Sequence, residues 1–317
     1  MSRAMAEEVW WAVARSEEVT GTKPINVDLG DQPLVLWRDV DGTVRALEDR
    51  CPHRRAPLSL GCILKSGAIQ CGYHGWTYDG ATGRLVDIPN LKGEQKYPPL
   101  YRAAAFAVTE QAGFVRVCLD AKASAPAPST ALAMSLSGTA HVALDHAQYL
   151  AALFDGPGLL LAIRGVRFTP YLMTELVGQD GKLVLERSCQ WASPHWPAPF
   201  SSDFPITLRI ATDAITGESE LALRDDAFNT LLTATLAPVP ASRGVTQVRW
   251  RASLADHRPG LMAKLLGAGA PLSVYSQIDA AALRLLKPSA SIHAATLRSD
   301  LADRLVSAPD SLDANVA

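Results

Sequence analysis

Four residues between positions 51 and 74 have types and spacing suited to metal binding. Cys51 and His53 are separated by one residue, Cys71 and His74 by two, and seventeen residues lie between the two pairs. Thiolate and imidazole groups are strong ligands for iron and zinc. Each pair combines one thiol with one imidazole in a short segment. The sequence therefore predicts a metal centre built from two paired loops.

Two kinds of centre use two cysteines and two histidines. A zinc site holds all four around one ion, but zinc fingers usually pair Cys with Cys and His with His along the chain. A Rieske [2Fe–2S] cluster is held by two Cys at one iron and two His at the other. The mixed pairs favour this cluster, with Cys51, His53, Cys71 and His74 as its ligands. Zinc is the alternative.

Short strands are predicted on both sides of these loops, over residues 1–120. The runs LVLWRDV and TVRALED flank Asp41-Gly42, and AFAVTEQ and GFVRVCL flank Gly113. An Asp-Gly pair between two strand-like runs is a strong hairpin signal. We therefore expect an antiparallel β domain with the metal-binding loops at one tip, where a rigid scaffold positions them for contact with a partner.

A linker and a second domain are predicted after residue 120. Residues 121–130, AKASAPAPST, have the composition of a linker. In residues 131–317, the helix-like segment ALDHAQYLAALF precedes strand-like runs at 164–177, 182–193, 206–216, 218–226, 229–239 and 246–254. Helical patterns follow at 271–287 and 294–308. This order predicts a curved antiparallel sheet that holds helices, and an α+β fold class for the whole chain.

Composition excludes several partners and locations. The 317 residues carry a net charge of −2, so neither nucleic acid nor a membrane surface is indicated as a partner. No apolar run approaches the ~18 residues of a membrane span. Acidic residues near the N-terminus replace the apolar core of a signal peptide, which predicts a cytoplasmic protein. In that reducing compartment Cys62, Cys118 and Cys189 are expected to be buried free thiols.

The loop segments resemble a known family. DRCPHRRAPLSLG and IQCGYHGWTYD are similar to the Rieske domain of bacterial Rieske non-haem iron oxygenases, terminal oxygenase components of the vanillate demethylase and phthalate dioxygenase type. WWAVARSEEV, DIP and VTEQAGFVRV follow the family order. Two residues depart from it, because Arg55 occupies a position usually held by glycine and Arg116 one usually held by tryptophan. The resemblance implies that residues 131–317 form a helix-grip domain.

The same resemblance implies a mononuclear iron held by an Asp-x-x-His-x4-His segment and by an Asp in the C-terminal helix. Alignment of that segment with residues 143–158 places its Asp on Asp145. Gln148 and Leu153 then occupy the two histidine positions. Leucine cannot bind iron, and an amide oxygen is a poor ligand for Fe(II). We therefore expect that this chain lacks the mononuclear iron.

An alternative iron site uses other residues. His141 and His146 have the required spacing between histidines, and Asp279 would supply the carboxylate of the facial triad. Gly138 stands where the family has its Asp, and the sequence around His141 is typical of a strand end. His195, in SPHWPAP, is expected to be a loop residue rather than a ligand.

Three functions are compatible with these observations. The first is an electron-transfer and structural subunit of a hetero-oligomeric Rieske oxygenase. It would pass electrons from a reductase or ferredoxin to the mononuclear iron of a homologous subunit in a trimer-based oligomer. The second is a self-sufficient mono-oxygenase that hydroxylates or demethylates a small apolar or aromatic substrate with O2. The third is a scaffold that binds a hydrophobic ligand without chemistry.

Two further roles concern the contacts between such subunits. By resemblance, Asp145 would bridge a cluster histidine of one subunit and an iron histidine of its neighbour, and the alternative is an acid favoured at a helix start. Arg54, Arg55 and Lys65 could form a positive rim that docks an acidic donor, and the alternative is a set of solvated surface charges.

Overall fold

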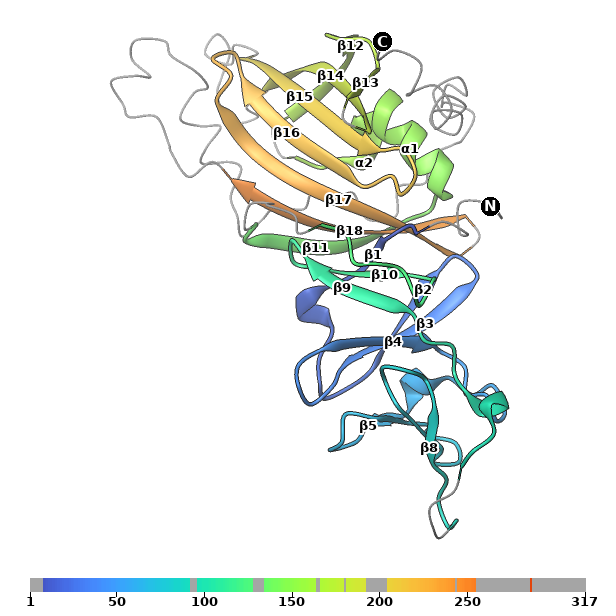
Figure 1. Cartoon of the computed structure of the whole chain (residues 1–317). Helices are drawn as coiled ribbons and strands as arrows, with labels where there is room; N and C mark the ends of the chain where they lie inside the picture. The colour runs from blue at the N-terminus through green and yellow to red at the C-terminus, as the bar shows by residue number, and fades with distance from the viewer. Residues whose placement is uncertain are drawn as a thin grey trace. The chain divides into compact units, whose positions relative to one another are not determined.

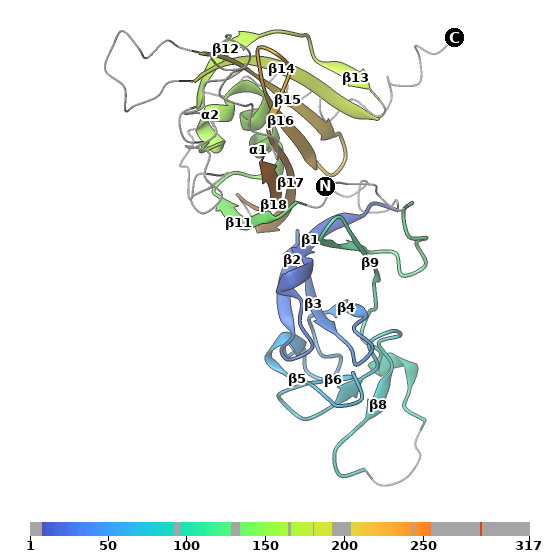
Figure 2. The same cartoon turned by 90° about the vertical axis from the view of Figure 1, so that its left-hand side faces the viewer.

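The computed structural model describes residues 8–91, 96–127, 134–163, 166–179, 181–191, 204–242, 244–254 and 286. They form two compact units (Figure 1 and Figure 2). The first contains the described residues up to 127 together with 239–242, and the second contains the remainder. Residues 123–127 carry no regular structure. None of the described helices is long and apolar enough to cross a membrane.

The first unit consists of three antiparallel sheets, which confirms the predicted β scaffold. The sheets have the orders β1 (Trp11–Arg15), β10 (Phe114–Cys118), β9 (Ala107–Gln111); β2 (Ile25–Leu29), β3 (Gln32–Arg38), β4 (Val44–Glu48); and β5 (Cys62–Ile63), β6 (Ile69–Gln70), β7 (Thr77–Tyr78), β8 (Leu85–Asp87). Short 3-10 helices are η1 (Ser16–Glu18), η2 (Leu58–Leu60) and η3 (Pro99–Tyr101).

The predicted turn at Asp41-Gly42 joins β3 to β4. Gly42 has a φ of 79°, in the left-handed region that glycine adopts without steric cost. The Asp39 carboxylate accepts hydrogen bonds from the backbone N–H groups of Asp41 and Thr43, at 3.0 and 2.9 Å. A side chain that satisfies the turn's own backbone donors stabilises this hairpin.

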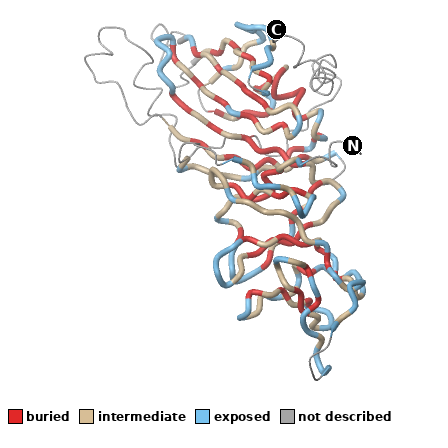
Figure 3. The backbone as a smooth tube through the Cα atoms, in the orientation of Figure 1, coloured by how far each residue is buried: buried red, intermediate tan, exposed pale blue. Residues whose placement is uncertain are grey.

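Buried residues run through the first unit (red in Figure 3). They form two apolar cores, and the second includes Cys51 and Cys71 of the metal-binding loops. This second core contains Trp37, Leu58, Ile69 and Tyr78, all of which have no exposed surface. The Trp37 indole N–H also donates to the carbonyl oxygen of Gly67 at 2.9 Å, so its one polar atom is satisfied. The loops therefore rest on a rigid, close-packed base.

The second unit is a curved sheet of eight antiparallel strands with two helices against one face (Figure 1). The sheet has the order β11 (Leu136–Val142), β18 (Val245–Leu254), β17 (Thr230–Ser242), β16 (Ser219–Asp225), β15 (Phe204–Asp213), β14 (Lys182–Trp191), β12 (Val166–Leu172), and β13 (Val177–Gln179) also pairs with β14. The helices are α1 (His146–Asp155) and α2 (Pro157–Leu160). This arrangement confirms the α+β class. The helical patterns predicted at 271–287 and 294–308 lie outside the described residues.

Two expectations were wrong. The run at 164–177 is not one strand, because the pairing of β12 with β14 shifts between Phe168 and Leu172, around Pro170, and β13 starts separately at Val177. Proline has no N–H for a sheet ladder, which explains the shift in pairing within β12. Cys118 and Cys189 are buried free thiols as predicted, but Cys62 is exposed in the two-residue strand β5, whose other residue, Ile63, packs against the second core.

Candidate metal centre

The first metal-binding loop is a tight turn that starts at Cys51. The Cys51 N–H donates to the Ala56 carbonyl oxygen at 2.8 Å, and the Arg55 N–H donates to the Cys51 carbonyl oxygen at 2.7 Å. Arg55 has a φ of 60°, in the left-handed region. This conformation favours glycine and costs other residues ~1–2 kcal/mol. It explains physically why a glycine is usual at this position.

The second loop repeats the geometry of the first. The Cys71 N–H donates to the Trp76 carbonyl oxygen at 2.9 Å, and the Gly75 N–H donates to the Cys71 carbonyl oxygen at 3.0 Å. Gly75 stands four residues after its cysteine, as Arg55 does, and has a φ of 72°. A Cβ at Gly75 would also lie 2.5 Å from Cγ of Pro89, so glycine is required there for space as well.

A buried carboxylate anchors the first loop to the scaffold. Asp49 is 4% exposed and accepts three hydrogen bonds. The donors are the Asn26 amide at 3.0 Å, the Ser59 N–H at 2.7 Å and the Ser59 hydroxyl at 2.6 Å. Asp49 thus ties the start of the loop to β2 and to η2, so the position of Cys51 is set by two separate elements.

The loops bring the four predicted ligands together as two like pairs. The Cys51 and Cys71 thiols are buried and lie within hydrogen-bonding reach of each other. The His53 and His74 rings lie side by side, with centroids 4.8 Å apart and planes tilted by 60°. Two thiols on one side and two imidazoles on the other is the arrangement in which a [2Fe–2S] cluster binds Cys at one iron and His at the other.

Burial determines the electrostatics of this site. Desolvation, together with the adjacent Cys51, raises the pKa of the Cys71 thiol, although the backbone N–H groups of Tyr73 and His74 act in the opposite direction. Burial and the nearby His74 lower the pKa of His53, which favours its neutral, metal-binding form. Binding of metal to such thiols must release their protons.

The residues present fit the cluster. The Nδ1 atom of His53 is buried and has no hydrogen-bond partner, which is costly for a polar atom unless a ligand such as iron engages it. Cys51 and Cys71 would hold one iron, and His53 and His74 the other. When bound, the cluster supplies reversible one-electron chemistry, while this chain supplies the ligands, their orientation and their burial.

The comparisons agree with this geometry. Residues 9–98 match the family model for the Rieske [2Fe-2S] domain. This part of the chain is a Rieske domain. A segment of 101 residues is 44% identical to the oxygenase component of dicamba O-demethylase from Stenotrophomonas maltophilia, and it covers 32% of this chain and 29% of that protein. A segment of 107 residues is 36% identical to the oxygenase subunit of vanillate O-demethylase from a Pseudomonas strain, covering 34% and 28%.

Solved structures extend the likeness to the whole fold. A structure of dicamba monooxygenase with non-heme iron and dicamba has a TM-score of 0.61 and 22% identity, and the match covers 96% of this chain and 98% of that one. NdmB of Pseudomonas putida CBB5 has a TM-score of 0.58 and 18% identity, with coverages of 94% and 88%. These identities support the shared fold alone. The sequence matches span less than a third of the length of the two curated relatives named above.

Three contacts of the Rieske domain could not be found from the spacing of residues. The Tyr78 hydroxyl lies 3.1 Å from the Cys51 sulfur in the core, where burial raises the pKa of Tyr78 and keeps it protonated. The Trp76 indole stacks on His53 with centroids 4.3 Å apart and planes at 1°. Tyr101 contacts Trp76 edge-on at 5.0 Å. The only sequence signal was aromatic enrichment just after the second loop.

The predicted positive rim is only partly available for docking. Arg55 is held by Glu48 at 2.9 Å, and Glu48 also lies 3.8 Å from Arg50. Arg54 and Lys65 are exposed and form no ion pair with the other described residues. Arg116, the second departure from the family, lies with its guanidinium 6.0 Å from the Phe114 ring.

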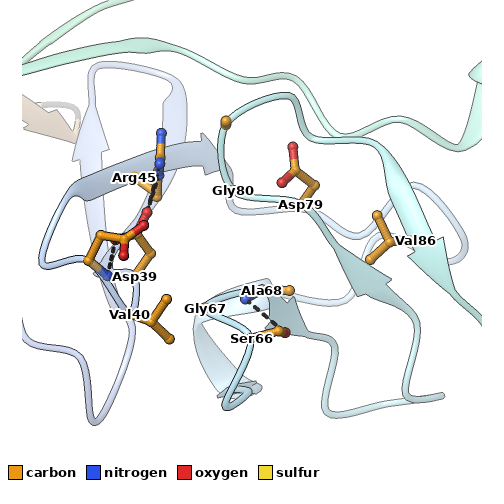
Figure 4. A pocket seen from close by; sticks show the side chains of 11 residues that line it. Asp39, Val40, Arg45, Ser66, Gly67, Ala68, Asp79, Gly80 and Val86 are labelled. Carbon is orange, nitrogen blue, oxygen red and sulfur yellow. Dashed lines mark hydrogen bonds and ion pairs between the residues drawn. The ribbon is translucent and has the colours of Figure 1, made fainter.

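A separate pocket of about 360 Å³ lies elsewhere in the first unit (Figure 4). Asp39, Arg45, Gly67 and Asp79 are among its lining residues. Arg45 and Asp39 form an ion pair at 2.7 Å, and Asp79 accepts a hydrogen bond from the Thr82 N–H at 2.8 Å. Its charged groups thus serve the surrounding turns.

In the second unit, α1 carries the residues aligned with the family iron segment. Asp145 is the N-cap, and its carboxylate accepts from the Gln148 N–H at 2.8 Å. The Gln148 side chain accepts in return from the Asp145 N–H at 3.2 Å. Leu153 has no exposed surface and belongs to the apolar core. Gln148 therefore serves as a capping partner and Leu153 as a packing residue.

The residues of the alternative iron site lie on different elements. His141 is exposed on β11, and its Nε2 is 3.0 Å from the Gln247 amide. His146 starts α1, and its Nε2 is 2.9 Å from the Thr216 carbonyl oxygen. Burial lowers the pKa of His146. Asp279, the third member of this alternative, lies outside the described residues, as do His195, His257 and His293.

Proposed function

We propose that this chain is an electron-transfer and structural subunit of a hetero-oligomeric Rieske oxygenase. It accepts electrons from a reductase or ferredoxin on the cluster held by Cys51, His53, Cys71 and His74. It passes them to the mononuclear iron of a homologous partner subunit, within a trimer-based oligomer. The isolated chain does not oxygenate a substrate.

The environment of α1 carries this proposal. The two positions aligned with the family's iron histidines hold residues with structural roles. Gln148 completes the capping box of α1, and Leu153 packs in the apolar core. Leu153 cannot bind Fe(II), and the amide oxygen of Gln148 is a poor ligand for it. The first unit contains the four residues that can hold a one-electron cluster. In the second unit, the two positions aligned with iron histidines hold Gln148 and Leu153. This combination favours transfer of the electron from the cluster to another subunit.

Asp145 remains the candidate for the contact with the neighbouring subunit. It is exposed, although one carboxylate oxygen caps α1. A carboxylate that holds the second N–H of a metal-bound imidazole orients the ring and fixes its tautomer. We propose that Asp145 plays this part toward His53 or His74 of an adjacent subunit.

Metal analysis of the purified, anaerobically reconstituted chain tests the proposal. We expect two irons and two acid-labile sulfides per chain, and Cys71→Ser should abolish both. The variants His141→Ala and His146→Gln should retain two irons. Three irons per chain, with the third lost in either histidine variant, would refute the proposal and favour the self-sufficient mono-oxygenase. A zinc-containing, colourless protein would overturn the cluster assignment itself.

Complementation is the second part of the test. The chain mixed with a reductase alone should consume no oxygen in response to substrates. Co-assembly with a related subunit that retains an intact Asp-x-x-His-x4-His segment should restore activity, and Asp145→Asn should reduce it without altering the cluster spectrum.

A further inference from the structure

Trp76 joins the two metal-binding loops. Its carbonyl oxygen accepts a hydrogen bond from the Cys71 N–H at 2.9 Å and so closes the second loop. Its indole stacks on His53 of the first loop, with ring centroids 4.3 Å apart and planes at 1°. Trp76 therefore connects the loop that carries Cys71 and His74 to the loop that carries His53.

The scaffold fixes Trp76 from both sides. Gly75, which precedes it, has a left-handed backbone with a φ of 72°. Thr77, which follows it, is 2% exposed, and its hydroxyl donates to the Gly75 carbonyl oxygen and accepts from the Gln70 amide, both at 3.3 Å. Tyr101 supports the indole edge-on, with centroids 5.0 Å apart and planes at 86°. The position of the indole is thus set by contacts that do not involve His53.

The His53 imidazole, in contrast, is held by ring contacts. Its Nδ1 atom is buried without a partner, and no residue that the structure describes forms a hydrogen bond with either ring nitrogen. A metal-bound imidazole is usually oriented by a hydrogen bond from its second nitrogen to a carboxylate or a carbonyl oxygen. Here the parallel stack with Trp76 and the tilted contact with His74 remain. The stack is therefore the contact that sets the plane of the His53 ring.

Trp76 also limits the access of water to one side of the site. The indole covers one face of the partly buried His53 ring, whereas His74 is exposed. Reduction adds one negative charge to a bound cluster, and water stabilises such a charge better than an apolar ring does. An apolar cover on the His53 side therefore lowers the reduction potential.

We propose that Trp76 is a positioning residue for electron transfer, which fixes the plane of the His53 ring before the cluster binds and excludes water from that side of the bound cluster. A flat aromatic face thus takes the part that a hydrogen-bonding oxygen plays at other metal-bound histidines. Trp76 itself binds no iron. The inference rests on the electron-transfer part of the proposed function and not on the destination of the electron.

Variants of Trp76 in the full chain, reconstituted anaerobically with the cluster, test this proposal. Trp76→Ala should raise the equilibrium constant for reduction about threefold, which corresponds to roughly 30 mV for one electron. It should also lose its cluster to excess EDTA about tenfold faster than the wild type, as is usual when an orienting contact of a metal ligand is removed. Trp76→Phe keeps a flat ring and should restore both values.

Trp76→Leu separates stacking from the filling of space. It keeps an apolar side chain but has no flat face, so it should lose its cluster faster than Trp76→Phe. Pulsed electron paramagnetic resonance of the reduced, 15N-histidine-labelled protein should show altered histidine hyperfine couplings in Trp76→Leu and unaltered couplings in Trp76→Phe. A residue that merely filled space would be replaced equally well by leucine and by phenylalanine, and that result would overturn the proposal.

Trp37→Phe is the matched control. Trp37 belongs to the apolar core against which Trp76 packs, and its indole donates to the Gly67 carbonyl oxygen at 2.9 Å. Within the described part of the chain its ring stacks on neither His53 nor His74. The variant should lower stability but leave the potential and the histidine couplings unchanged. A shift as large as that of Trp76→Ala would refute the positioning role, because loss of packing alone would then explain it.

Tyr101 variants decide the question if Trp76→Ala takes up no cluster. Tyr101→Ala removes the support of the indole and leaves both loops intact, so it should shift the potential and the rate of cluster loss in the same direction but less far. Tyr101→Phe keeps the ring edge and should match the wild type. Wild-type behaviour of both Tyr101→Ala and Trp76→Leu would contradict the proposal. Three irons per wild-type chain would refute the proposed function alone, since these measurements report only on the Rieske cluster.

Discussion

We predict that the hydroxyl of Tyr78 raises the reduction potential of the bound cluster through its hydrogen bond to the Cys51 sulfur. The two atoms are 3.1 Å apart, and Tyr78 has no exposed surface, so water cannot replace the bond. Reduction adds negative charge to the cluster and strengthens donation from the phenol. The bond therefore stabilises the reduced state more than the oxidised state and raises the potential.

The substitution Tyr78→Phe removes this donor and keeps the ring. A hydrogen bond to a charged group contributes ~1.5–3 kcal/mol, and if about half of that is gained on reduction, the potential should fall by roughly 30–65 mV for one electron. Burial keeps the pKa of Tyr78 above its usual range, so the shift should not depend on pH through the phenol itself.

Redox titration followed by visible absorption and electron paramagnetic resonance measures this shift. Tyr73→Phe is the matched control, because Tyr73 is exposed and contacts His74 with its ring rather than a sulfur with its hydroxyl. It should change the potential by less than about 10 mV, well below the shift worked out from the lost hydrogen bond. An unchanged or raised potential in Tyr78→Phe, with an intact cluster spectrum, would refute the reasoning.

Two further predictions concern stability. Arg55→Gly should change the free energy of unfolding by less than ~1 kcal/mol, since relief of the left-handed conformation offsets the lost contact with Glu48, whereas Arg55→Val should cost ~1–2 kcal/mol. Urea unfolding followed by the cluster absorption distinguishes the two, and equal effects would contradict the backbone argument. For His146, whose pKa is lowered by burial, the unfolded chain takes up a proton near pH ~6.5 and the folded chain only at lower pH. Stability should therefore fall below pH ~6.5 by up to ~1.4 kcal/mol per pH unit, and His146→Gln should flatten this dependence of the urea midpoint.

Local sequence signals were sufficient to select four candidate ligands that the structure brings together, and to predict much of the fold. Cys51, His53, Cys71 and His74 are short-range pairs, and a hairpin such as that at Asp41-Gly42 is specified by adjacent residues. What was missed depends on residues distant in the chain. Cys62 is exposed whereas Ile63, next to it in β5, packs against the second core, and which face of so short a strand is covered depends on tertiary packing rather than on local pattern.

The contacts that tune the site are also long-range. The Asp49 carboxylate meets Asn26 from 23 residues away, and Tyr78 meets Cys51 from 27 residues away. Neither pairing follows any helical or strand periodicity. The left-handed backbone of Arg55 is a local feature that its residue type does not predict, because arginine has no preference for that conformation. Gly75, at the equivalent position of the second loop, has the same left-handed backbone and the residue type that favours it.

Gln148 and Leu153, the two residues of α1 that we align with the family's iron histidines, are both integrated into the fold. Replacement of Leu153 by histidine would bury an imidazole among Tyr149, Phe154 and the sheet core, at a cost that only a metal or a hydrogen-bond partner could offset. Replacement of Gln148 would remove half of the capping box that starts the same helix. Histidines at these two positions would thus weaken α1 at its start and in its packed centre together. In the Rieske domain the reverse holds, since the thiols and imidazoles are buried or paired in ways that an iron–sulfur cluster would satisfy. The first unit therefore has residues that can hold a redox cluster, whereas the aligned residues of α1 serve helix capping and core packing. This difference favours electron transfer to another subunit.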